Sequence, residues 1–240
     1  MHITGTLLDH FIVIPHYNLL FCTIDKNANT LLAHIAAKLM KKNPLITSTH
    51  DMTYDAVRLR VKANSKKMIM EILQNTSWKK LLIYRDPVER FVSAYSSKCE
   101  ECHIYRRGDG CYNCQSALYL PRNINVSMEQ VANQLKGISL HNPHWIPQHK
   151  FCGDLKQSWF YYDHIIPMSS NSFVSRLENA LTSTISNVDM MHIKPFIIKR
   201  NHGLIKQTHD CRNISTRVQK IVSDVYKDDY EWIKLLKYDE

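Results

Sequence analysis

Glycine is scarce in this chain, with six residues among 240, which argues against collagen-like, linker-rich and many all-β designs. No run of about eighteen apolar residues occurs, so we expect no transmembrane helix. The first residues, Met1–Thr4, lack the cationic and apolar regions of a signal peptide. Internal repeats, low-complexity segments and Pro/Gly-rich linkers are also lacking, so we expect one domain spanning residues 1–240.

Positive charge exceeds negative charge, with 31 Lys and Arg against 22 Asp and Glu and a formal net charge of +9. This balance favours an anionic partner such as a nucleotide, an acidic glycan, nucleic acid or a membrane surface, although a soluble basic surface also accounts for it. Formal N-glycosylation acceptors at Asn75, Asn125 and Asn213 point weakly to a secretory compartment, because such triplets often arise by chance.

Apolar stretches alternate with helical patterns along the chain. We expect strands at 11–14, 19–24, 80–84 and 160–166. Asp86 is a predicted N-cap, with Pro87 at the first helical position and Glu89 closing a capping box. Other helices are expected at 30–42, 54–73, from Ser127 onward, 170–181, 214–226 and 229–236, with a polar, basic loop at 199–213. This alternation predicts an α/β fold with a central, mostly parallel sheet flanked by helices.

The segment Asp25–Thr30 follows the second expected strand and leads into a helix. Ligands of parallel sheets gather at the carboxyl ends of the strands, and the free amides of a first helical turn attract anions. Lys26 adds a cation and Thr30 adds a hydroxyl donor. The segment lacks the glycine pair of a GxxxxGK[ST] loop, and its lysine precedes the helix by several residues. A kinase acting on a small nucleotide is therefore disfavoured.

A second motif begins at Arg85, where the third expected strand ends, and includes Ser93 two helical turns later. Arginine binds phosphate through its planar fork, and serine adds a neutral donor. A capped helix with a surface ion pair is the simpler interpretation of Arg85 and Asp86, and a solvated side chain is the simpler one for Lys26. Two phosphate-binding segments at two strand ends instead suit a nucleotide with phosphates at two separate places.

The two motifs together resemble those of the 3′-phosphoadenosine-5′-phosphosulfate (PAPS) dependent carbohydrate sulfotransferases, the Golgi enzymes that act on chondroitin, dermatan and related glycans. The family's 5′-phosphosulfate loop reads P-K-V-A-C-T-N, and residues 25–31 keep its lysine, alanine and threonine. The family's 3′-phosphate motif, R-D-P-F-E-R-L-V-S-A-Y, matches residues 85–95 almost throughout. Residues 144–148 are similar to its H-W-x-P-Q block, and residues 162–166 are similar to its Y-D-F-V strand. Asp25 departs from the family's proline and adds a negative charge.

The resemblance implies a P-loop-like sulfotransferase fold and transfer of a sulfuryl group from PAPS to a carbohydrate hydroxyl, without a catalytic metal. Lys26 would neutralise the leaving phosphate. The implied PAPS contacts are Lys26, Asn27, Ala28, Asn29, Thr30, Arg85 and Ser93. The implied partners are a glycan acceptor and the nucleotide, and nucleic acid is not expected. The implied compartment is the Golgi lumen, with the cytoplasm as the alternative.

The general base has two candidates, His50 and His144. His50 lies between the two motifs in the order seen in sulfotransferases whose base belongs to a Thr-His pair, and His144 begins the His-Trp block. Trp145 either lines the acceptor cleft or belongs to the core. Residues 199–206 either close over the nucleotide or an acidic glycan, or form a solvated basic loop.

A Cys-rich insert is expected at about 99–120. On spacing alone, Cys99, Cys102, Cys111 and Cys114 suit a structural four-thiolate zinc site. The alternative is disulfides within the insert, with Cys152 and Cys211 forming or joining another bridge and Cys22 as the odd free thiol. Cysteines of related luminal enzymes favour the disulfides.

Two other functions remain in competition with sulfuryl transfer. A zinc-knuckle nucleic-acid-binding protein would explain the charge and the cysteine pairs but leaves the segment from Arg85 to Ser93 unexplained. An inactive sulfotransferase-like protein that binds a glycan would fit the extra charge of Asp25.

Overall fold

The structure is a computed structural model that describes residues 10–40, 65–100, 126–168, 171–210 and 214–236. The chain divides into two compact units, and each unit is built from two segments. The first unit comprises Met1–Arg85 and Lys150–Ile205, and the second comprises Asp86–His149 and Lys206–Glu240. Among the described residues, no helix has the length and apolarity needed to cross a membrane.

A four-stranded sheet forms the centre of the first unit. Its strands follow the order β1-β2-β3-β4, and only the β1–β2 pair is antiparallel. The strands are β1 (Phe11–Ile14), β2 (Leu19–Cys22), β3 (Lys79–Tyr84) and β4 (His164–Pro167). β1 and β2 are joined through a short 3₁₀ turn, Pro15–Tyr17, that ends at Asn18 in a left-handed conformation. The expected α/β class with a mostly parallel sheet is confirmed.

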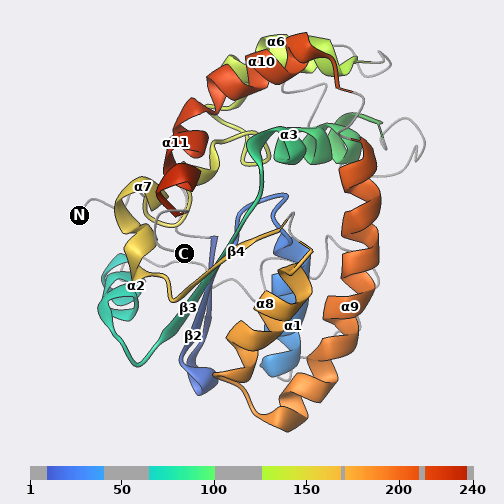
Figure 1. Cartoon of the computed structure of the whole chain (residues 1–240). Coiled ribbons are helices and arrows are strands. Elements are labelled where there is room, and N and C mark those ends of the chain that lie inside the picture. Colours follow the sequence, from blue (N-terminus) through green and yellow to red (C-terminus); the bar gives the residue numbers. More distant parts are fainter. Residues whose placement is uncertain (1–9, 41–64, 101–125, 169–170, 211–213, 237–240) are drawn as a thin grey trace. The chain divides into compact units, whose positions relative to one another are not determined.

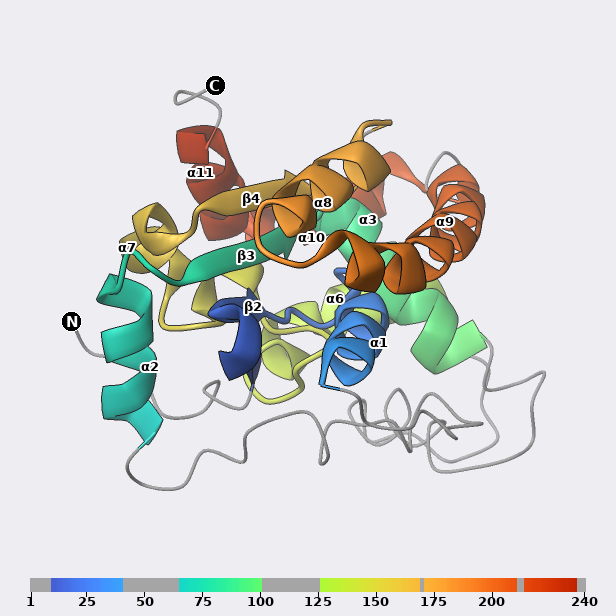
Figure 2. The same ribbon diagram turned by 90° about the horizontal axis from the view of Figure 1, so that it is seen from below.

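Helices cover both faces of this sheet. Alternate strand residues, such as Phe21 and Leu81, join one apolar core with residues of three helices. These helices are α1 (Asn29–Leu39), α8 (Phe173–Thr182) and α9 (Asn187–Asp210). α2 (Ser65–Gln74) and the short α7 (Leu155–Ser158) lie on the other side of the strands (Figures 1 and 2). β1, β2 and the middle of β3 are buried on both faces, as expected for a sheet covered on each side, whereas the edge strand β4 is mostly half-buried.

The second unit is helical. It contains α3 (Pro87–Tyr95), a π-helical turn (Ser96–Glu100), α6 (Met128–Ile138), α10 (Thr216–Val225) and α11 (Lys227–Leu236). Its core joins apolar residues of α3, α6 and α10 with Trp145 and Tyr226. α6 begins with the expected capping box, in which Ser127 and Gln130 exchange hydrogen bonds. Ser215 caps α10 by accepting from the amide of Val218.

Two expected elements are wrong in part. The strand expected at 160–166 begins only at His164, and Trp159–Tyr161 form a 3₁₀ turn. In the observed register Leu81 pairs with His164, so residues 160 and 161 lie before the point where β3 begins and have no strand to pair with. The loop expected at 199–213 is helical as far as Asp210. No proline follows Pro195, and a single glycine lowers helix stability by only about 1 kcal/mol, so the helix from Asn187 continues.

Most of the remaining helices start within a few residues of their expected positions. α1 begins at Asn29 and α8 at Phe173. Residues 54–64 of the helix expected at 54–73 lie outside the described residues, as do residues 101–120 of the Cys-rich insert.

Candidate active site

The loop between β2 and α1 turns sharply at Lys26. The amide of Asn27 donates to the carbonyl of Ile24 at 3.0 Å, which closes a β-turn with Lys26 at its third position. Lys26 has φ 71° and Ala28 has φ 56°, both in the left-handed region. Each such non-glycine residue costs on the order of 1 kcal/mol. Backbone strain of this kind collects at binding and catalytic sites.

Two side chains of the loop hold it in this conformation. The amide nitrogen of Asn27 donates to the carbonyl of Ile83 in β3 at 3.2 Å. Asn29 donates to the Oδ1 atom of Asp25 at 2.7 Å, and both residues are buried. The carboxylate of Asp25 is therefore tied to the first turn of α1, where a negative charge is stabilised by the helix dipole.

The amino end of α1 has no side-chain cap. Ala28 is the N-cap residue, and its methyl side chain cannot accept a hydrogen bond from the first-turn amides. Lys26 and Thr30 are half-buried at this end of the helix. Backbone amides, a lysine and a hydroxyl at one helix terminus form a suitable environment for a phosphate or sulfonate group.

Arg85 lies at the same edge of the sheet. β2 and β3 are parallel neighbours with Cys22 opposite Leu82, so the residues that follow both strands emerge side by side. Arg85 directly follows β3 and is only 2% exposed. A guanidinium held out of water interacts strongly with anionic groups because the local dielectric constant is low.

The second unit carries the rest of this motif on α3. Asp86 caps the helix by accepting from the amides of Val88 and Glu89, as expected. Tyr230 of α11 donates to the other carboxylate oxygen of Asp86 at 3.4 Å. Burial of the phenol, followed by the charge of Asp86, raises the pKa of Tyr230 to about 12, so it remains a donor at neutral pH. Ser93, two turns further on, is buried.

Arg90 in the middle of α3 holds the loop that contains the His-Trp block. Its guanidinium is buried and donates to the carbonyls of Ile146 at 2.8 Å and Pro143 at 3.2 Å. Trp145 is fully buried against Phe91, with ring centroids 5.6 Å apart. The interpretation of Trp145 as part of an acceptor cleft is therefore wrong, and its apolar surroundings place it in the core. Much of the second motif thus has a structural purpose.

Asp229 of α11 anchors the end of the same loop. Its fully buried carboxylate accepts from the amide of Gln148 at 2.8 Å, from the amide of His149 at 2.8 Å and from Nδ1 of His149 at 2.8 Å. Sequence reasoning missed Asp229 and His149. The sequence Asp228-Asp229 gives no sign of which carboxylate is buried, and His149 is one of thirteen histidines.

Replacing Asp229 with asparagine is expected to lower the free energy of unfolding by about 2–4 kcal/mol. Asparagine keeps the shape, but its NH2 group would face backbone donors without an acceptor. Asp228→Asn is the matched control, because that side chain is 54% exposed and its loss should cost less than about 0.5 kcal/mol. Denaturant unfolding followed by circular dichroism measures both, and equal effects would contradict the assigned role.

Of the two candidate bases, only His144 lies among the described residues. His50 lies outside the described residues. His144 is half-buried in the loop after α6, where its backbone amide donates to the side-chain oxygen of Asn142 at 3.1 Å. His144 and Ser93 belong to the second unit, whereas the loop at Lys26 and Arg85 belong to the first.

The cysteines correct one expectation. Cys22, expected as the free thiol, forms a disulfide with Cys152 in the first unit. Cys22 is the last residue of β2. The segment that contains Cys152 lies next to this end of the strand, with 5.9 Å between the Cα atoms of Cys22 and Cys152. Cys99 is also disulfide-bonded, and its partner lies outside the described residues. No cluster of metal-ligating side chains occurs in the part of the chain that the structure describes.

Comparisons with known proteins agree with this architecture. The family model described as "Sulfotransferase family" matches residues 9–238, and the chain belongs to this family, which places it among the transferases. A segment of 114 residues is 32% identical to carbohydrate sulfotransferase chst-1 of Caenorhabditis elegans. That alignment covers 44% of this chain and 34% of the worm protein, so it spans about a third of the relative's length. No solved structure gives a significant match.

Proposed function

We propose that this protein is a PAPS-dependent carbohydrate sulfotransferase. The observation that carries the proposal is the strained loop around Lys26, which lies beside buried Arg85 at the carboxyl edge of the sheet. The family match and the likeness to a carbohydrate sulfotransferase support a sulfuryl donor and a sugar acceptor. Both units would form one catalytic domain.

In this proposal the nucleotide is held at both ends. Lys26, the loop residues Asn27 and Ala28, and the first-turn residues Asn29 and Thr30 bind the 5′-phosphosulfate. Arg85 and Ser93 bind the 3′-phosphate through a charged fork and a hydroxyl. Two anchors along one molecule fix the direction of its sulfonate, and positioning of this kind contributes a large part of catalysis.

The reaction is an in-line displacement at sulfur. The oxygen of a sugar hydroxyl forms a bond to sulfur while the bond from sulfur to the bridging phosphate oxygen breaks. The electron pair leaves with adenosine 3′,5′-bisphosphate, and a general base takes the hydroxyl proton. Lys26 stabilises the negative charge that develops on the leaving oxygen. These side chains supply the charge compensation without a catalytic metal.

Arg85→Ala is expected to weaken binding of adenosine 3′,5′-bisphosphate about 100-fold, because the 3′-phosphate loses charge-assisted hydrogen bonds. Isothermal calorimetry measures the affinity, and the wild-type protein should prefer this nucleotide to ATP. The affinity of Arg85→Lys for adenosine 3′,5′-bisphosphate should lie between those of the wild type and Arg85→Ala, because lysine keeps the charge and loses the planar fork.

Arg217→Ala is the matched control for this experiment. Arg217 is 71% exposed and pairs with Glu129 on the surface, so its loss should leave nucleotide affinity unchanged. Because Arg85 is buried, thermal melting must first show that its variants are folded. If a folded Arg85→Ala protein binds adenosine 3′,5′-bisphosphate with wild-type affinity, the proposed site is wrong.

The base is tested by His50→Ala and His144→Ala in separate proteins. The variant that lacks the base should turn over roughly 10²–10⁴-fold more slowly, with nucleotide affinity retained. His141→Ala is the control, because His141 is an exposed neighbour of His144. Turnover that stays normal in both candidate variants would reject both assignments.

The competing functions gain less support. The disulfide at Cys99 removes one of the four thiolates that the zinc-knuckle interpretation needs. The hydrogen bond from Asn29 ties up the carboxylate of Asp25, which weakens the argument for an inactive glycan-binding protein. We place the protein in the Golgi lumen by analogy with its carbohydrate sulfotransferase relative, and its disulfides suit such an oxidising compartment.

A further inference from the structure

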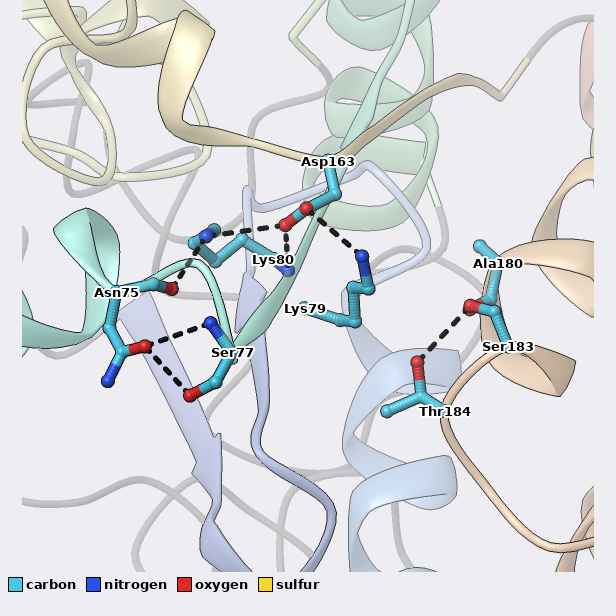
Figure 3. A network of polar contacts seen from close by, with 8 residues as sticks. All are labelled: Asn75, Ser77, Lys79, Lys80, Asp163, Ala180, Ser183 and Thr184. Carbon is cyan, nitrogen blue, oxygen red and sulfur yellow. Dashed lines mark hydrogen bonds and ion pairs between the residues drawn. The ribbon is translucent and has the colours of Figure 1, made fainter.

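The turn between α2 and β3 carries the sequence Asn75-Thr76-Ser77, in which the asparagine and serine side chains are hydrogen-bonded to each other. The Oδ1 atom of Asn75 accepts from the backbone amide of Ser77 at 2.9 Å and from its hydroxyl at 2.7 Å. This is an Asx turn closed by both donors of the serine. Figure 3 shows the Nδ2 atom of Asn75 pointing away from Ser77. Within the described part of the chain, that nitrogen makes no hydrogen bond.

The backbone of this turn is fixed from the inside. The carbonyl of Asn75 accepts from the amide of Trp78 at 3.2 Å and from the Nζ atom of buried Lys80 at 3.1 Å. Lys80 also pairs with Asp163 at 3.4 Å, next to β4 (Figure 3). The turn is therefore held by its main chain, while Asn75, Thr76 and Ser77 are all exposed. A large group on Nδ2 would displace none of these contacts.

The other two acceptor triplets differ from this one. Val126 and Ile214, their middle residues, are buried in the core of the second unit. Their serines, Ser127 and Ser215, use the side-chain oxygen to cap α6 and α10. In those triplets the serine oxygen accepts from a helix amide, whereas the hydroxyl of Ser77 donates to the asparagine of its own triplet.

We propose that Asn75 is a site of N-linked glycosylation. In the reaction, Nδ2 forms a bond to the anomeric carbon of an oligosaccharide carried on a lipid diphosphate. The bond between that carbon and the diphosphate oxygen breaks, the lipid diphosphate leaves with the electron pair, and Nδ2 gives one proton to a base of the transferring enzyme. The disulfide between Cys22 and Cys152 is a second, independent sign of a secretory compartment.

The test is production of the full chain in eukaryotic cells, directed into the endoplasmic reticulum by a fused, cleavable signal. Peptide mass spectrometry after release of glycans by an amidase should identify Asn75 as the site with the highest occupancy. Asn75→Gln and Ser77→Ala should each remove its glycan, whereas Ser77→Thr should keep it. Asn125→Gln and Asn213→Gln are matched controls that should leave it in place.

An unmodified Asn75, or lower occupancy there than at Asn125 or Asn213, would overturn the proposal. Because Ser77→Ala leaves Asn75 itself intact, the test does not depend on the folding of Asn75→Gln. A folded-state readout comes from the melting temperature, which should be the same before and after enzymatic removal of the glycan. This experiment does not depend on PAPS binding, so the site and the proposed activity succeed or fail separately.

Discussion

Lys26→Met should lower turnover of PAPS about 10³-fold or more, because a single cation aimed at the charge of a transferring group is worth this much in comparable reactions. Methionine keeps the unbranched stem of lysine and meets the same left-handed backbone, where Lys26 has φ 71°. The variant therefore tests the charge rather than the fold of the loop. Transfer of labelled sulfate to a glycan acceptor measures the rate.

The pattern of kinetic constants distinguishes a catalytic Lys26 from one that only binds. If Lys26 acts on the leaving oxygen, kcat falls much more than affinity for PAPS, because the charge on that oxygen develops only as the bond to sulfur breaks. Lys26→Arg should recover part of the activity. Lys67→Met is the matched control, since Lys67 is 86% exposed and pairs only weakly with Glu71. Equal kcat values for Lys26→Met and Lys67→Met would refute the role.

The elements that a sequence predicts well here are those with local causes. The helix after Arg85 begins where Asp86 and Pro87 place it, because an N-cap and a first-turn proline act within a few residues. The same is true of the capping box at Ser127. The failure at residues 160 and 161 has a distant cause, because aromatic residues with high strand propensity need a partner strand, and β3 begins too late to pair with these two.

In the candidate site, too, the features with local causes could be predicted and those that depend on distant residues could not. The residue types of Lys26 and Arg85 indicate a phosphate site, and parallel pairing of their strands then brings them to one edge. The sequence does not reveal that Asn27 binds the carbonyl of Ile83, or that Asp229 binds the loop at His149. Those contacts join residues far apart in the chain, and each side chain is of a common type whose partner depends on the tertiary fold.

The cysteine pairing shows most clearly why local reasoning fails. Cys22 and Cys152 are separated by 130 positions, and neither has a nearby cysteine that marks it as half of a pair. Cys22 ends a buried strand, a position where a small apolar thiol is common. Only the return of the chain past β2, after the whole first segment of the second unit, brings the two residues together.

This disulfide joins the two segments of the first unit, Met1–Arg85 and Lys150–Ile205, across the intervening chain. Closing a loop of 130 residues removes much of the freedom of the unfolded chain. Replacing Cys22 and Cys152 together by alanine is therefore expected to lower the free energy of unfolding by about 5 kcal/mol. Both side chains are fully buried, so alanine avoids placing a polar group in the core.

Denaturant unfolding of the two oxidised proteins, wild type and Cys22→Ala/Cys152→Ala, gives the difference directly. Keeping both samples oxidised leaves the bridge at Cys99 intact, so the comparison isolates one crosslink. Counting of free thiols in the unfolded wild type tells whether the crosslink is present. The double variant should unfold at a lower denaturant concentration with a larger m-value, because its unfolded chain is less compact. Equal midpoints would show that the crosslink does not stabilise this unit. Two additional reactive thiols in the wild type would show that the crosslink between Cys22 and Cys152 has not formed.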